Sequence, residues 1–125
     1  FDVRALVAGS KLADAASINR LNNLTGTAGV GETMLGWYVQ SGFDVLRGTG
    51  SAHQLLPYVR YEEVNTQRTV AAGFSADPAQ DMSVLALGVA WKPVPQVVTK
   101  VGYQVHRNDM DTGLNQWNIQ MGWLF

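Results

Sequence analysis

The chain has 125 residues, about one domain, and its net charge of -1 gives no electrostatic reason to expect nucleic-acid binding. Cysteine is absent, which excludes a disulfide scaffold, a zinc-thiolate site and a thiol nucleophile. The sequence contains no apolar run of the roughly 18 residues that a transmembrane helix needs. Because Phe1 already belongs to an alternating segment and no initiating Met or signal peptide precedes it, we interpret the chain as mature or truncated and favour truncation.

Apolar residues recur with a period of two, which is typical of β-strands. Six segments show this pattern, and in chain order they are residues 1–10, 35–45, 54–62, 83–92, 97–106 and 115–125. Within the first connection, "DAASINRLNN" predicts a short helix capped by Asp14. Pro57 lies inside the third segment, where we expect a strand end or a bulge because proline cannot donate a ladder hydrogen bond.

The connections between these segments read long, short, long, short and medium in length. A chain that passes up and down, with short turns at one end and longer loops at the other, produces this order. The pattern is typical of an outer-membrane β-barrel. We therefore predict an all-β fold, an antiparallel up-and-down meander of about six strands within a transmembrane β-barrel, with residues 1–125 forming one segment without separate domains.

The large aromatic residues share the apolar face of the predicted strands. If the long loops are external, one group lies at the external strand ends: Trp37, Tyr61, Tyr103 and Trp117. A second group lies at the periplasmic ends: Phe43, Trp91, Trp123 and Phe125. Aromatic girdles that flank an aliphatic band are typical of transmembrane barrels. A soluble β-domain core is the alternative, but it gives no reason to sort aromatics to both rims.

The last segment, "NQWNIQMGWLF", resembles the C-terminal β-signal of bacterial outer-membrane proteins, which the barrel assembly machinery recognises. The resemblance rests on Trp117, Ile119, Met121, Trp123 and Phe125. Further back, "GWYVQSGFDVL", "LLPYVRYEEVNTQ" and "LGVAWKPVPQVVTKVGYQV" resemble the C-terminal portion of porins of the phosphate-selective porin O and P type.

This resemblance implies a sixteen-stranded, trimeric porin in the outer membrane of a Gram-negative bacterium. Its implied partners are the lipid bilayer, the barrel assembly machinery acting through the C-terminal strand, other copies of the chain, and small inorganic or organic anions. The family's basic ladder and constriction loop lie mostly upstream of these residues. We therefore transfer no substrate-binding residue from the family.

The polar face supplies the candidate lumen-facing residues, which are Arg4, Tyr58, Arg60, Lys100 and His106. One interpretation is a basic wall that attracts anions. The alternative is that the two arginines pair across strands with Asp2, Asp44 or Glu62.

No catalytic, metal or cofactor site is predicted. The loop acids fit no EF-hand spacing, and we interpret them as solvated rather than calcium-binding: Asp77, Asp81, Asp109 and Asp111. His53 and His106 have no second ligand at metal spacing, and no serine lies in a readable His–Asp constellation. Besides the porin, two alternatives stay open: a soluble or small-barrel ligand-binding module of lipocalin type, and a barrel anchor or adhesin without transport.

Overall fold

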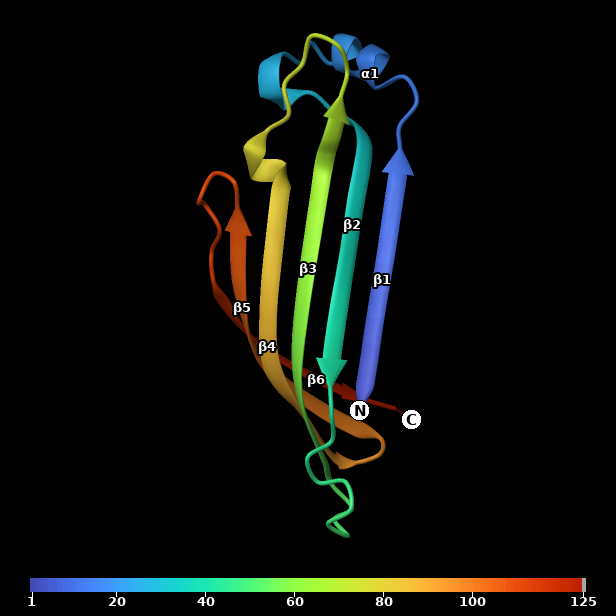
Figure 1. The fold of residues 1–125 in the computed structure, drawn as a ribbon, viewed down its shortest axis with the longest axis vertical. Coiled ribbons are helices and arrows are strands. Elements are labelled where there is room, and N and C mark those ends of the chain that lie inside the picture. The colour runs from blue at the N-terminus through green and yellow to red at the C-terminus, as the bar shows by residue number, and fades with distance from the viewer. Residues whose placement is uncertain (125) are drawn as a thin grey trace.

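The computed structural model describes residues 1–124, which form one six-stranded antiparallel sheet with strands in chain order (Figure 1). The strands are β1 (Asp2–Lys11), β2 (Gly31–Gly42), β3 (Gln54–Val70), β4 (Asp81–Val94), β5 (Val97–Asn108) and β6 (Gln116–Trp123). The helices are α1 (Ala15–Leu21) and the short 3-10 helices η1 (Gly26–Ala28) and η2 (Pro78–Gln80). This arrangement confirms the predicted all-β meander.

Helix α1 begins where the sequence predicts, but its predicted side-chain cap is wrong. Asp14 occupies the N-cap position with φ 61°, and its side chain makes no capping hydrogen bond. A side-chain cap requires extended backbone at this position, whereas Asp14 is left-handed. Its carbonyl oxygen accepts hydrogen bonds from the backbone N–H groups of Ser17 and Ile18 instead. None of the described helices has the length and apolar character needed to cross a membrane.

The sheet register keeps the predicted apolar positions that lie within the described strands on one face. Outside the register shifts at Gly31↔Val70 and Val94↔Val97, opposite residues have the same parity, as in the row Ala5, Val39, Tyr61, Leu85 and Val105. Side chains alternate between the two faces of a strand, so this register joins the odd-numbered positions into one apolar face and the even-numbered positions into one polar face.

The predicted order of connection lengths is wrong. The β2–β3 connection spans residues 43–53 and the β3–β4 connection only 71–80, because β3 continues to Val70. This extension pairs with the start of β2 through two register shifts. At the shifts the chains approach so closely that a Cβ on Gly31 would lie 2.2 Å from the Thr66 carbonyl oxygen. The residues "NTQRTV" pair through their backbone, and their polar side chains show no period of two.

Pro57 lies near the start of β3, and the pairing of β3 with β4 passes it without a bulge. Its carbonyl oxygen accepts a hydrogen bond from the Phe43 N–H at 3.4 Å, so the position of its missing N–H faces the end of β2. A residue in an antiparallel ladder directs both backbone groups to the same neighbour. Of the two placements predicted, the strand end is the one found.

The sheet is twisted and curled, with the lower halves of β4, β5 and β6 sweeping across the long axis (Figure 1). The β1–β2 connection, which contains α1, and the β3–β4 connection, which contains η2, lie at one end, and the β2–β3 and β4–β5 connections lie at the other. Among residues 1–124, the buried apolar residues are Ala15, Ala71, Ala86 and Ala90. The large apolar side chains therefore form an exposed surface rather than a core.

Candidate functional site

The polar face of the sheet forms a groove with a volume of about 280 Å³. All six strands contribute to it, which makes this face the concave one. The groove contains four of the five predicted lumen-facing residues, namely Arg4, Tyr58, Arg60 and Lys100. His106 lies on the same face but outside the groove, and its ring nitrogen is 3.4 Å from the side-chain oxygen of Gln104.

The charge of the groove is predominantly positive. Four basic residues line it, with Asp2 as the acidic one: Arg4, Arg60, Lys92 and Lys100. Glutamines and small residues complete the lining, including Gln40, Gln104, Gln120, Gly42 and Ala90. A concave surface with an excess of one charge raises the local concentration of ions of the opposite charge.

Both arginines of the groove are paired with carboxylates on their own strands. Arg4 Nη2 lies 2.9 Å from Asp2 Oδ2, and Arg60 Nη2 donates to Glu62 Oε2. The guanidinium of Arg60 also lies 4.1 Å from the centroid of the Tyr38 ring, at cation–π distance. The pairing predicted as an alternative is thus present, but it runs along each strand rather than across strands. Asp44 instead accepts the backbone N–H groups of Leu46 and Leu55.

The lysines of the groove differ from the arginines. Among residues 1–124, the two ion pairs are those of Arg4 and Arg60, and no carboxylate lies within 4.0 Å of the Lys92 or Lys100 ammonium. Lys100 lies opposite Ala90, so Lys92 is its diagonal neighbour on the same face. Lys92 was missing from the predicted site although its position in the alternating segment 83–92 places it on the polar face.

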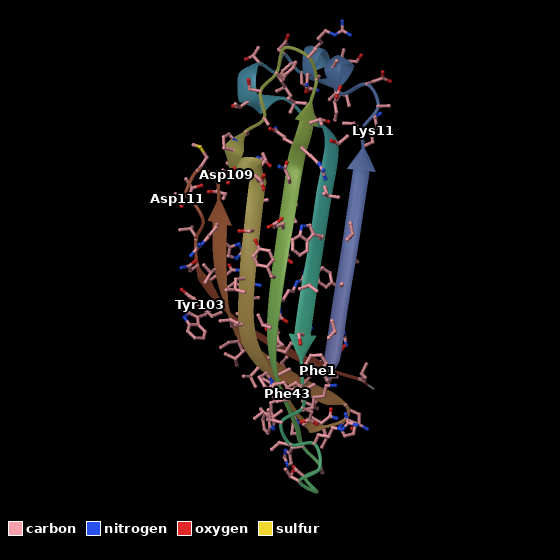
Figure 2. The ribbon with its side chains drawn as sticks, viewed as in Figure 1. Phe1, Lys11, Phe43, Tyr103, Asp109 and Asp111 are labelled. Carbon is pink, nitrogen blue, oxygen red and sulfur yellow. The ribbon has the colours of Figure 1, made fainter. Side chains whose placement is uncertain are left out.

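The apolar face carries its aromatics at two levels. At one level, the Trp37 and Tyr61 ring centroids are 5.5 Å apart and those of Tyr103 and Trp117 are 5.0 Å apart. The second group, Phe43, Trp91 and Trp123, lies at or near the ends of β2, β4 and β6, toward the β2–β3 and β4–β5 connections, and Phe125 lies outside the described residues. Figure 2 shows Phe43 beside Phe1 near one end of the sheet, with Tyr103 farther along and Asp109 and Asp111 beyond it in the β5–β6 connection.

A carboxylate at the first level was not predicted. Glu63 lies on the apolar face, where its two oxygens accept hydrogen bonds from Trp37 Nε1 at 3.1 Å and from the Tyr61 hydroxyl at 2.7 Å. The predicted strand ended at Glu62, one residue before Glu63, whereas β3 continues to Val70. Continuing the alternation from Tyr61 would have placed Glu63 on this face.

Two of the predicted loop acids accept hydrogen bonds from a backbone N–H group or a side-chain amide. Asp77 Oδ1 accepts the Ala79 N–H at 2.9 Å, and Asp81 accepts from Asn65 Nδ2 at 2.8 Å. Within residues 1–124, no group of three or more His, Asp or Glu side chains is arranged to hold a metal ion.

Taken together, the described residues define an open antiparallel sheet with a polar, basic concave face and an exposed apolar face. An uncharacterized protein of Aquifex aeolicus (strain VF5) is 25% identical to the chain over 132 aligned residues. The alignment covers the whole chain but only 30% of that relative. No protein-family model and no solved structure matches the chain.

Proposed function

We propose that this chain is the C-terminal portion of an outer-membrane porin, in which the apolar face contacts lipid and the groove forms part of the channel wall. Small hydrophilic solutes, with anions of the phosphate type preferred, diffuse passively through the channel and no chemical step occurs. As the resemblance implies, the complete barrel has sixteen strands, forms a trimer, and is assembled through the C-terminal strand by the barrel assembly machinery.

The exposed apolar face is the observation that carries the proposal. Trp117, Ile119 and Met121 on β6 are 73%, 77% and 68% exposed, and similar side chains continue across the sheet. Soluble monomers rarely expose contiguous apolar patches larger than a few hundred Å². A lipid bilayer covers such a face without any partner protein.

The spacing of the aromatics supports a membrane position. Trp37 on β2 and Phe43, which directly follows β2, are six residues apart, as are Trp117 and Trp123 on β6. This corresponds to about 20 Å along a strand, or about 15 Å after a tilt of roughly 40°. The rings extend the apolar surface beyond both levels, toward the roughly 25 Å band of outer-membrane barrels.

The groove and the sheet edges support the channel. Polar side chains line the concave side, whereas a lipocalin places apolar residues there, and this difference disfavours the soluble ligand-binding alternative. Strands β1 and β6 are edges of the described sheet, and unpaired edges are closed in barrels. The Aquifex relative is more than three times as long as the stretch that aligns, a length that leaves room for further strands.

The proposal is tested by inserting the protein, produced from its complete gene, into planar lipid bilayers. We expect stepwise conductance and, across a KCl gradient, a reversal potential that reports anion preference. A Lys92→Gln/Lys100→Gln double variant should reduce this preference, whereas Lys11→Gln, at the end of β1 and outside the groove, should not. Absence of conductance steps refutes the channel and leaves the anchor or adhesin alternative; unchanged selectivity in the double variant refutes the role of the groove charge.

A further inference from the structure

The ring of Tyr58 lies across two glycines on the floor of the groove. Tyr58 on β3 is directly opposite Gly88 on β4, which is opposite Gly102 on β5. A Cβ on Gly88 would lie 2.6 Å from the Tyr58 hydroxyl oxygen and 2.7 Å from Cζ. A Cβ on Gly102 would lie 2.7 Å from the same hydroxyl oxygen. Since neighbouring strands are about 4.8 Å apart, the ring crosses β4 and ends over the seam with β5.

The floor beneath the ring consists of small residues. On the same face of β4, Gly88 is flanked by Ala86 and Ala90, which are 6% and 8% exposed, and Gly102 is also buried. Side chains on a strand ordinarily stand roughly perpendicular to the sheet. The missing Cβ atoms at positions 88 and 102 provide the space in which the Tyr58 ring lies flat instead.

We propose that the orientation of the Tyr58 ring sets the open width of the groove. Gly88 and Gly102 keep the groove wide because they leave the space in which the ring lies flat. This inference rests on the proposed channel function. Along β3, Tyr58 lies between Arg60 and Leu56, and the row of Leu56 contains Lys100. A ring raised from the floor would therefore stand between Arg60 on one side and Lys100 on the other, in the path of a solute that moves along the groove.

Gly102→Ala is the most selective way to raise the ring. The atoms nearest to the added methyl group are the Tyr58 hydroxyl oxygen at 2.7 Å and the Leu87 carbonyl oxygen at 3.2 Å, and no other Tyr58 atom lies within 3.8 Å. Gly88→Ala is less suitable because its methyl group would also lie 2.6 Å from the Val101 carbonyl oxygen. Gly122→Ala is the matched control on the same face, since its nearest neighbour is a Val98 methyl group at 3.4 Å.

The experiment measures single-channel conductance of the full-length protein in planar bilayers. We expect Gly102→Ala to lose conductance, Gly122→Ala to match the unsubstituted protein, and Tyr58→Phe combined with Gly102→Ala to regain conductance, because the hydroxyl oxygen is the only Tyr58 atom that obstructs the methyl group. If Gly102→Ala does not assemble, recovery of assembly in the combined variant supports the contact, and failure of both to assemble overturns it.

The possible outcomes distinguish an error in the role assigned to Tyr58 from an error in the proposed channel function. Conductance that is unchanged in Gly102→Ala, or that Tyr58→Phe does not restore, overturns the assigned role of Tyr58 while the channel stands. An unsubstituted protein without conductance steps overturns both. Thermal unfolding in detergent provides a readout independent of conductance: the melting temperature should fall in Gly102→Ala and recover in the combined variant. Equal melting temperatures of these two variants overturn the assigned ring position.

Discussion

A charge placed on the apolar face distinguishes lipid contact from water contact. Leu87 lies on this face of β4, directly opposite Tyr103 on β5 and four residues before Trp91 on its own strand, and is 48% exposed. Ser83 lies on the same face of the same strand, opposite Glu63 and beyond the Tyr61 level. The variants Leu87→Arg and Ser83→Arg therefore place the same side chain at two different depths of the proposed bilayer, on the same strand.

The expected penalties differ because the environments differ. An arginine on the lipid face of an outer-membrane barrel costs about 2–4 kcal/mol at the bilayer midplane and about 0–1 kcal/mol near an interface. We expect Leu87→Arg to fall in the first range. We expect Ser83→Arg to fall in the second, since Ser83 lies near the start of β4, where the side chains of Glu63, Asp81 and Arg107 already form a charged cluster. If the face were bathed in water, each substitution would change stability by about 0.5 kcal/mol or less.

The assay is denaturant unfolding of the full-length protein in phospholipid vesicles, followed by tryptophan fluorescence. The difference between the two variants should be at least about 1 kcal/mol, which is the smallest gap between the midplane and interface penalties. Equal unfolding free energies for Leu87→Arg and Ser83→Arg would refute the position of this face in the bilayer. Repeating the measurement in lipid-free detergent should narrow the gap, because a micelle adapts to the charge.

Three further variants test other features. Glu63→Ala removes the acceptor of two hydrogen bonds and should cost about 1–2 kcal/mol of unfolding free energy with a shifted Trp37 emission, whereas unchanged emission would contradict the contact. Gln67→Ala leaves the Gly29 carbonyl and the Asp77 N–H without their partner, so the β1–β2 and β3–β4 connections should loosen and trypsin should cleave after Arg20 faster; equal cleavage rates would argue against this link. Deletion of Phe125 should reduce assembly into membranes far more than the conductance of the barrels that form, and equal losses in the two measurements would contradict an assembly signal.

The two faces of the sheet were predictable from the sequence because the side-chain period of a strand does not depend on its neighbours. Trp117 and Ile119 belong to one face whichever strand pairs with β6. The end of β3 was not predictable in this way. Its last residues, 66–70, are mostly polar and pair with the start of β2 across two register shifts, so the backbone and a close approach at Gly31 determine the strand there.

Contacts between residues on different strands can be predicted only when the pairing register is known. The alternation of apolar and polar residues in the sequence does not give this register. Tyr58 was expected on the polar face, but its contact with Gly102, two strands away, follows only from the pairing of β3 with β4 and of β4 with β5. His106 was expected beside the other lumen-facing candidates because it also occupies an even-numbered position. It lies outside the groove because its row is one step beyond that of Gln104, and parity carries no information on position along the strand.

The ion pairs in the groove show which basic side chains remain available to bind a solute. Arg4 and Arg60 each have a carboxylate two residues away on the same strand, a spacing that is visible in the sequence and that neutralises them locally. Lys92 and Lys100 are diagonal neighbours, and within residues 1–124 no carboxylate forms an ion pair with either ammonium group. An anion that enters the groove meets no competing carboxylate at the lysines, whereas at the arginines it must compete with a bound carboxylate. For this reason the lysine pair, rather than the arginines, is where we expect substitution to change selectivity most.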